Sequence, residues 1–124
     1  MNGNRLDYEA ADAELDRRRA LALAQGGTQR VADQHAKGRL TARERIALLL
    51  DDESFVEIGQ LAHSDHADIG EKAPADAIIT GIGSIDGRKV AVVAVDSTVM
   101  AGTTGWVGAH KQARIATIAV KKGY

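Results

Sequence analysis

Five basic side chains gather around one predicted helix start and offer the clearest chemistry in the sequence. Arg39, Arg43 and Arg45 form the cluster at this helix start, and Arg30 and Lys37 lie nearby in the sequence. Thr41 and Glu44 form a capping box there, in which each side chain satisfies a free backbone N–H of the other residue. Helix N-termini favour anions, and guanidinium groups match the geometry of phosphate. The segment therefore predicts a site for the phosphates of a nucleotide-like ligand such as coenzyme A (CoA).

A solvated helix face would explain the same charges. Exposed arginines commonly pair with neighbouring carboxylates at little gain in stability. Glu44, Asp51 and Asp52 are close enough in the sequence to serve as such partners. The anion site and the solvated face therefore remain alternatives at this point.

A second candidate site is the loop 98–105, which is rich in glycine and threonine and lies between a predicted strand and a predicted helix. Ligands of α/β folds often bind beyond the carboxyl ends of strands, where small residues let backbone groups approach. The loop is not a phosphate-binding P-loop, because no Gly-Lys-Ser/Thr follows it. From the residues alone, a plain structural loop is the better explanation.

The residues alone predict neither a metal site nor a catalytic centre. His63 and His66, with the aspartates beside them, could supply metal ligands, but their segment has no helical pattern and no group to orient the imidazoles. Exposed loop polarity explains them better. His35 and His110 are isolated, and no carboxylate pair stands out for acid–base catalysis.

The composition fits one small cytoplasmic domain. A chain of 124 residues can bury a useful core, and with only 3% aromatic residues that core must consist of Ala, Val, Ile and Leu. A formal net charge of -1 argues against a general nucleic-acid binder or a polybasic membrane-surface protein. The absence of cysteine excludes disulfides and zinc–thiolate sites. No signal peptide and no apolar run of membrane-spanning length is present, so we expect a cytoplasmic location.

The N-terminal part of the chain predicts helices. The first helix, from about Leu6 to Ala24, has a thin apolar face, which suits either an arm that packs on another domain or subunit or a frayed surface helix. A second helix spans residues 28–36, and a third begins at the capping box. Residues 54–58 are extended, and residues 59–74 lack a sustained period and form a loop.

The C-terminal part predicts a β-hairpin and a helix. Two β-rich runs, 78–85 and 88–95, flank Asp86-Gly87, and a type I′ turn there needs positive φ at both positions. Residues 90–95 are apolar without alternation, which predicts a strand that is covered on both faces. A helix follows at 107–122. Its expected inward residues are Ile115, Ile118 and Ala119, and its expected outward residues are Lys111, Arg114 and Lys121.

A buried strand followed by an inward-facing helix calls for a further strand to pair with it. The expected fold class is therefore α/β (α+β mixed), with N-terminal helices before a ββα unit that is incomplete. We divide the chain into a helical region with a short strand (1–58), a loop (59–75) and the ββα unit (76–124).

Several motifs, in this order, resemble the N-terminal segment of the carboxyltransferase (β) subunits of biotin-dependent acyl-CoA carboxylases of the propionyl-CoA and acetyl-CoA type. They are QHAKGRLTARERI at 34–46, LLLD at 48–51, SFVE at 54–57, TGIGSIDGR at 80–88 and DSTVMAG at 96–102. The resemblance covers about residues 18–124. Consecutive motifs in one order are far more specific than any one of them.

The resemblance implies a crotonase-like fold of repeated ββα units and a hexameric assembly. It implies that a carboxyl group moves from carboxybiotin, carried by a biotin carboxylase or biotin carrier partner, to the α-carbon of an acyl-CoA, with backbone N–H groups holding the oxyanions. It places the loop after the early central strand along the CoA site. The cofactor-binding residues expected here are Ala101, Gly102, Thr103, Thr104, Arg39, Arg43 and Arg45.

The chain departs from the family pattern in two respects. Trp106 and Gly108 stand where many members carry a Glu and a His, which leaves the acyl substrate open. The Gly-Gly oxyanion element of the first domain and the biotin-binding second domain would fall beyond Tyr124. We therefore expect no catalytic residue in this chain, and no activity unless it is joined to the remaining part of the carboxyltransferase. The alternatives are a short non-catalytic subunit or docking module of a carboxylase complex, and a homo-oligomeric α+β domain without a ligand.

Overall fold

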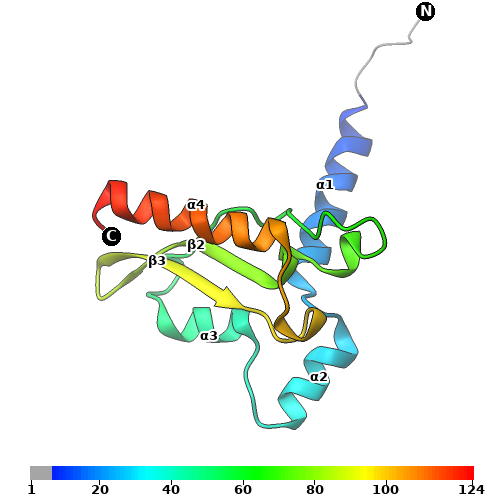
Figure 1. The fold of residues 1–124 in the computed structure, drawn as a ribbon, viewed down its shortest axis with the longest axis horizontal. Coiled ribbons are helices and arrows are strands. Elements are labelled where there is room, and N and C mark those ends of the chain that lie inside the picture. The colour runs from blue at the N-terminus through cyan, green and yellow to red at the C-terminus, as the bar shows by residue number, and fades with distance from the viewer. Residues whose placement is uncertain (1–6) are drawn as a thin grey trace, which may run out of the picture.

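A computed structural model describes residues 7–124 of the chain, in which three helices and a short strand precede a β-hairpin and a C-terminal helix (Figure 1). The elements are α1 (Tyr8–Leu23), α2 (Thr28–Ala36), α3 (Ala42–Leu49), β1 (Val56–Glu57), β2 (Ile78–Ile85), β3 (Arg88–Val95) and α4 (Trp106–Lys122). The predicted bounds of α2 are confirmed. The predicted start of the first helix at Leu6 lies outside the described residues.

The three strands form one antiparallel sheet in the order β1-β2-β3, with β2 in the middle. The predicted hairpin turn is confirmed, because Asp86 (φ 50°) and Gly87 (φ 78°) both have positive φ. The backbone N–H groups of both residues donate to the carboxylate of Asp51 over 2.9 Å each. Asp51 thereby fixes the hairpin turn to the end of α3.

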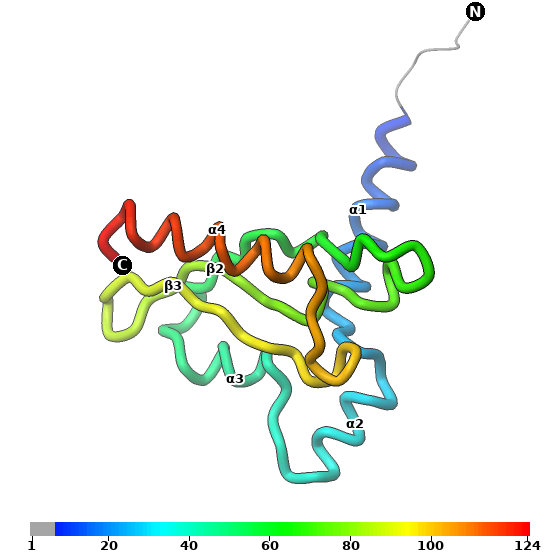
Figure 2. The backbone as a smooth tube through the Cα atoms, viewed as in Figure 1, coloured from blue at the N-terminus to red at the C-terminus, as the bar shows by residue number. Residues whose placement is uncertain are grey.

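Two helices cover opposite faces of the hairpin, as the backbone trace in Figure 2 shows. On one face, Ile46 and Leu50 of the α3 segment pack with Ile79 and Val92 of the strands. On the other face, α4 lies so close that a side chain added at Gly108 would come within 2.9 Å of Ile78. The neighbouring residues Ile78 and Ile79 thus point to opposite sides, and the prediction of a mixed α/β fold with a ββα unit is confirmed.

The prediction that residues 90–95 are covered on both faces is wrong for β3. The side chains of Val93 and Val95 are 46% and 54% exposed, whereas β2 is buried along most of its length. Within the described residues β3 lies at an edge of the sheet and has a partner on one side only. The continuous apolar run therefore predicted double coverage for the wrong strand of the hairpin.

The prediction that Lys111 faces outward is also wrong, although Arg114 and Lys121 are exposed and Ile115 is buried as expected. Lys111 is only 8% exposed, and its ammonium group donates to the backbone carbonyls of Ala75 and Ile78. A lysine can thread its aliphatic stem through apolar surroundings when carbonyl oxygens receive the charged end. Helical periodicity alone cannot reveal such a partner.

A left-handed 3₁₀ turn, Ala75–Ala77, leads into β2. The φ angles of Ala75, Asp76 and Ala77 are 58°, 49° and 63°, and all three residues are buried. This backbone region costs a non-glycine residue about 1–2 kcal/mol, so the surrounding contacts must hold the turn in place.

Only one of the two hydrogen bonds expected for the capping box is present at the start of α3. Thr41 Oγ1 accepts a hydrogen bond from the backbone N–H of Glu44 over 3.2 Å, as predicted. The Glu44 carboxylate, however, contacts the imidazole of His35 and the hydroxyl of Thr41 rather than the Thr41 N–H. The hydrogen bond with His35 is the main reason that the pKa of Glu44 lies below its usual value.

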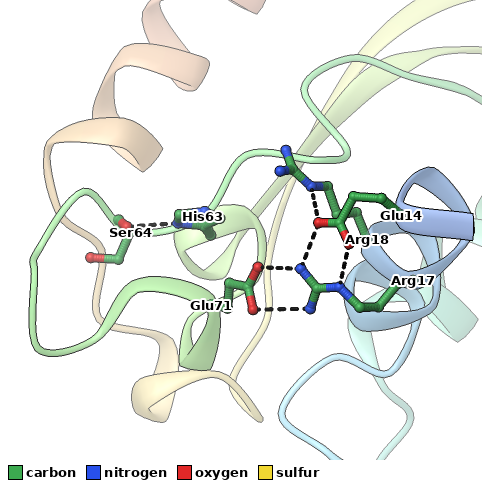
Figure 3. A network of polar contacts seen from close by, with 6 residues as sticks. All are labelled: Glu14, Arg17, Arg18, His63, Ser64 and Glu71. Carbon is green, nitrogen blue, oxygen red and sulfur yellow. Dashed lines mark hydrogen bonds and ion pairs between the residues drawn. The ribbon is translucent and has the colours of Figure 1, made fainter. Parts of the chain in front are cut away.

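The side chain of Arg17 joins α1 to the loop that precedes β2 (Figure 3). The guanidinium group of Arg17 lies between Glu14 of the same helix and Glu71 of the loop, with N–O distances of 2.8 and 2.9 Å. Hydrogen bonds from Arg17 and Arg18 lower the pKa of Glu14 to about 2. These pairs are exposed, so they contribute little to stability. None of the helices within residues 7–124 is long and apolar enough to span a membrane.

Candidate functional site

A hollow of about 460 Å³, partly open to solvent, lies between α2 and the loop that follows β3. Its lining comprises Arg30, Asp33 and Gln34 of α2, the C-cap residue Lys37, and Ser97, Thr98 and Ala101 of the loop. Arg30 and Lys37 are basic and Asp33 is acidic, so the lining has a net positive charge. Small loop residues facing a positive wall can accommodate a phosphate-bearing ligand.

The start of the loop is held by a buried aspartate. Asp96 Oδ1 accepts hydrogen bonds from the backbone N–H of Thr98 over 3.0 Å and from its hydroxyl over 2.6 Å. The Thr98 hydroxyl oxygen in turn accepts from the backbone N–H of Gly26 over 3.0 Å. Gly26 belongs to the turn between α1 and α2, so this chain of bonds sets where α2 stands relative to the loop.

The middle of the loop is a 3₁₀ turn, Met100–Gly102, in which all three residues have positive φ. The Thr103 hydroxyl donates to the Met100 carbonyl over 2.6 Å and closes the turn. Ala101 lies at the wall of the hollow, while Gly102 backs onto Val95 of β3. A turn of small residues next to a positive wall leaves room for a ligand to lie against the backbone.

The end of the loop is held by a second buried aspartate, Asp76 of the left-handed turn. Its Oδ2 atom accepts from the backbone N–H groups of Gly105 over 2.9 Å and Gly108 over 2.8 Å, at the first turn of α4. No side chain next to the helix provides this cap, because the N-cap residue is Gly105 itself. Gly108 is required for the close approach, since a Cβ there would lie 1.8 Å from Thr104 Oγ1 and 3.0 Å from the Asp76 carbonyl oxygen.

The structure separates the three arginines that the sequence placed in the site. Arg43 forms a bidentate pair with Glu57 of β1 over 2.7 and 3.0 Å, with side-chain exposures of only 17% and 7%. Arg45 lines a different hollow, between α3 and β3, and Arg39 is exposed. None of the three lines the hollow beside Ala101.

Arg30 and Lys37 are the two basic residues that do face the loop. They were grouped with the cluster in the sequence but were not expected to be its main members. The spacing of Arg30, Gln34 and Lys37 puts all three on one face of a helix, and this signal could have separated them from the later arginines. The basic wall of the hollow is therefore one face of α2 together with its C-cap residue, and the predicted N-terminus of α3 is not part of it.

The histidines do not converge on a common point. His63 Nδ1 lies 2.8 Å from the carbonyl oxygen of Ser64 (Figure 3), and His66 Nδ1 accepts from the backbone N–H of Asp68. Across residues 7–124 there is no group of three or more His, Cys, Asp or Glu side chains that could hold a metal ion.

The buried position of Lys111 predicts an alkaline increase in stability. Burial lowers the pKa of Lys111 from about 10.5 to about 8, against the opposing effect of Glu57. Between these two values the folded protein has released a proton that the unfolded chain still binds. The free energy of unfolding should therefore rise between pH 8 and pH 10, with a slope of at most about 1.4 kcal/mol per pH unit from this group.

Urea denaturation of the protein and of Lys111→Met over this pH range isolates the effect. The rise should be larger in the wild type than in the variant, which lacks the titrating group. Parallel pH curves for the two proteins would show that Lys111 keeps an ordinary pKa.

Known proteins resemble this chain in sequence and in structure. A family model described as the carboxyl transferase domain matches residues 33–124, which include α3, the sheet, the loop and α4. The chain belongs to the carboxyl transferase domain family. Ala101, Gly102, Thr103 and Thr104 all lie within the matched residues, whereas Arg30 precedes them.

Relatives of this chain are named as subunits of enzymes. It is 46% identical over 114 residues to the biotin-dependent acetyl-/propionyl-coenzyme A carboxylase beta5 subunit of Mycobacterium tuberculosis, covering 90% of this chain and 21% of that protein. It is 40% identical over 119 residues to the mitochondrial propionyl-CoA carboxylase beta chain of Homo sapiens, covering 92% and 22%. Identity to the methylmalonyl-CoA decarboxylase subunit alpha of Veillonella parvula is 41% over 112 residues, covering 88% and 22%. The chain thus spans about a fifth of the length of these relatives.

A solved structure shows the same arrangement of elements. The transcarboxylase 12S, determined with methylmalonyl-coenzyme A and methylmalonic acid bound, matches with a TM-score of 0.85 and 35% identity over 96% of this chain and 24% of that one. The predicted family and the predicted fold class, the first part of a crotonase-like carboxyltransferase, are confirmed. The division into 1–58, 59–75 and 76–124 remains a prediction.

Proposed function

We propose that the chain forms the acyl-CoA-binding part of a carboxyltransferase, which moves a carboxyl group from carboxybiotin to the α-carbon of an acyl-CoA. The hollow between α2 and the loop after β3 supports this most directly, because it combines a positive wall with a turn of small residues. The names of the relatives described above refer to acyl-CoA substrates. The structure of the transcarboxylase 12S contains methylmalonyl-coenzyme A.

In this proposal Arg30 and Lys37 hold the phosphates of CoA, while the backbone of Ala101 to Thr104 lies along its pantetheine arm. An extended CoA molecule needs a positive region for its phosphates and a narrow, neutral path for its thioester arm. The loop is fixed at both ends by buried carboxylates, so little conformational freedom is lost on binding. Arg43 is already paired with Glu57 and has a structural role here.

Carboxybiotin, carried by a biotin carboxylase or biotin carrier partner, supplies the carboxyl group. We assign no residue of 7–124 to biotin. The rest of the carboxyltransferase would provide that site, and we propose that the chain is inactive without it. We further propose a cytoplasmic, oligomeric enzyme, because the similar transcarboxylase 12S is described as a hexamer. The acyl chain of the substrate stays open.

A decarboxylase role is the second candidate, because one relative at 41% identity is named as a methylmalonyl-CoA decarboxylase subunit. The same acyl-CoA site serves both directions, since the carboxyl group is either added to or removed from the same α-carbon. An assay of the assembled enzyme in both directions, with propionyl-CoA and with methylmalonyl-CoA, separates the two. If the chain is instead a docking module without catalysis, the subunit that contains it should catalyse neither the carboxylation nor the decarboxylation.

Charge reversal tests the proposed phosphate wall. In the complete carboxyltransferase with its biotin partner, Arg30→Glu together with Lys37→Glu should raise the KM for propionyl-CoA about tenfold and change kcat less than about twofold, since these side chains bind the ligand far from the reacting carbon. The control is Arg88→Glu with Lys89→Glu, which reverses the same two charge types on the exposed hairpin end and should leave KM unchanged. Equal KM values for both double variants would refute the assignment of the phosphate wall.

A further inference from the structure

The left-handed turn before β2 and the start of α4 are bonded to each other in both directions. From the turn, Asp76 Oδ2 accepts the backbone N–H groups of Gly105 and Gly108. From the helix, Lys111 Nζ donates to the carbonyls of Ala75 and Ile78, which bracket Asp76 in the sequence. Each segment therefore satisfies buried polar groups of the other.

Interactions between neighbouring residues alone do not explain the conformation of either segment. The turn has three consecutive non-glycine residues with positive φ, a combination that persists only where the surroundings determine it. The first turn of α4 has free N–H groups, and its own N-cap residue, Gly105, has no side chain to receive them. Asp76 supplies this acceptor from 29 residues away in the sequence.

We propose that Asp76 and Lys111 are positioning residues that set the place of the loop 101–105 relative to the sheet. The proposal rests on the proposed function, because it is this loop that we assign to acyl-CoA. Asp76 fixes the carboxyl end of this loop at Gly105, while Asp96 holds Thr98 shortly before its start. Lys111 keeps the turn that carries Asp76 in its left-handed form.

The packing at Gly108 makes the arrangement sensitive to small shifts. A Cβ at this position would meet Thr104 Oγ1 at 1.8 Å, Ile78 Cγ1 at 2.9 Å and the Asp76 carbonyl oxygen at 3.0 Å. Helix α4 thus lies against the turn at backbone distance, and Thr104 of the loop is part of the same contact. Loss of the Asp76 carboxylate would release Gly105 and Gly108 together and allow the loop to move.

Three substitutions separate hydrogen bonding from charge and from backbone strain. Asp76→Asn keeps an oxygen acceptor at the same place and tolerates the left-handed conformation. Asp76→Gly removes the acceptor while relieving the strain at this φ, so any loss is due to the missing carboxylate. Asp65→Gly, in the exposed loop before β2, is the control for an aspartate-to-glycine change outside the site.

The first measurement is amide hydrogen exchange without any ligand, in the complete carboxyltransferase. Asp76→Gly should accelerate exchange at Gly105 and Gly108 at least tenfold, while Asp76→Asn and Asp65→Gly stay within threefold of the wild type. The second is steady-state kinetics in the assembled enzyme: Asp76→Gly should raise the KM for propionyl-CoA about tenfold and change kcat less, and Asp76→Asn should restore most of the loss. If Asp76→Gly does not fold, Lys111→Met, which removes only the second set of bonds, should raise the KM about threefold.

The exchange measurement and the kinetic measurement test different parts of the proposal. Unchanged exchange at Gly105 and Gly108 in Asp76→Gly would overturn the positioning role, whatever the kinetics. Faster exchange with an unchanged KM for acyl-CoA would overturn the link between this role and the binding loop. A wild-type enzyme that acts on no acyl-CoA would contradict the proposed function, while the exchange result would still decide whether Asp76 positions the loop.

Discussion

Arg43→Met should lower the free energy of unfolding by about 3–5 kcal/mol, because it leaves the buried carboxylate of Glu57 without its partner. Glu57 is 7% exposed and would keep one side-chain hydrogen bond, from the amide of Gln60. A loss of this size is a large part of the stability of an ordinary small domain. Urea denaturation followed by circular dichroism measures it directly.

The double variant Arg43→Met with Glu57→Leu is the matched control, since it replaces both charges with apolar side chains. It should recover most of the lost stability, because burying two apolar groups is about as favourable as burying a charge pair. If Arg43→Met costs less than about 1 kcal/mol, Arg43 is free enough to serve as an anion ligand, and our structural role for it is wrong.

Gly26→Ala should cost about 3 kcal/mol and should also displace α2 from the loop. A Cβ at Gly26 would lie 1.8 Å from the carbonyl oxygen and 2.4 Å from the carbonyl carbon of Thr98. These are backbone atoms that cannot rotate aside, so the turn must move and give up its hydrogen bond to the Thr98 hydroxyl. Thermal unfolding reports the loss of stability, and a raised KM for acyl-CoA in the complete enzyme reports the displacement.

Gly27→Ala in the same turn separates crowding from backbone strain. No atom lies within 4 Å of a Cβ at Gly27, so only backbone strain is expected, at about 1–3 kcal/mol, because its φ of 96° and ψ of 166° belong to a region that is nearly confined to glycine. The KM for acyl-CoA should then stay near the wild-type value. A KM for acyl-CoA that stays near the wild-type value in Gly26→Ala as well would mean that the turn does not press against Thr98.

Local sequence signals predicted the elements that form from neighbouring residues. Asp86-Gly87 identified the hairpin turn because few residue pairs adopt positive φ twice. The spacing of apolar residues placed α4 within one residue of its start, and Thr41 was correct as the N-cap of α3. These features depend on contacts only a few residues apart.

Partners far apart in the sequence could not be predicted in the same way. Arg43 pairs with Glu57 of β1, and Lys111 reaches carbonyls 33 and 36 residues away. Arg30 and Ala101 face each other across the hollow because of the way in which the turn at Gly26 packs against Thr98. The sequence therefore indicated a basic cluster and a candidate loop, but only the fold shows which basic residues face that loop.

Photo-cross-linking with an acyl-CoA that bears a diazirine tests the central claim most directly. The probe is applied to the complete carboxyltransferase, with and without excess unlabelled CoA, and labelled peptides are mapped by mass spectrometry. Our account predicts CoA-protected labelling within residues 28–37 and 97–105, the two walls of the hollow. Protected labelling that falls only outside these two segments would contradict it.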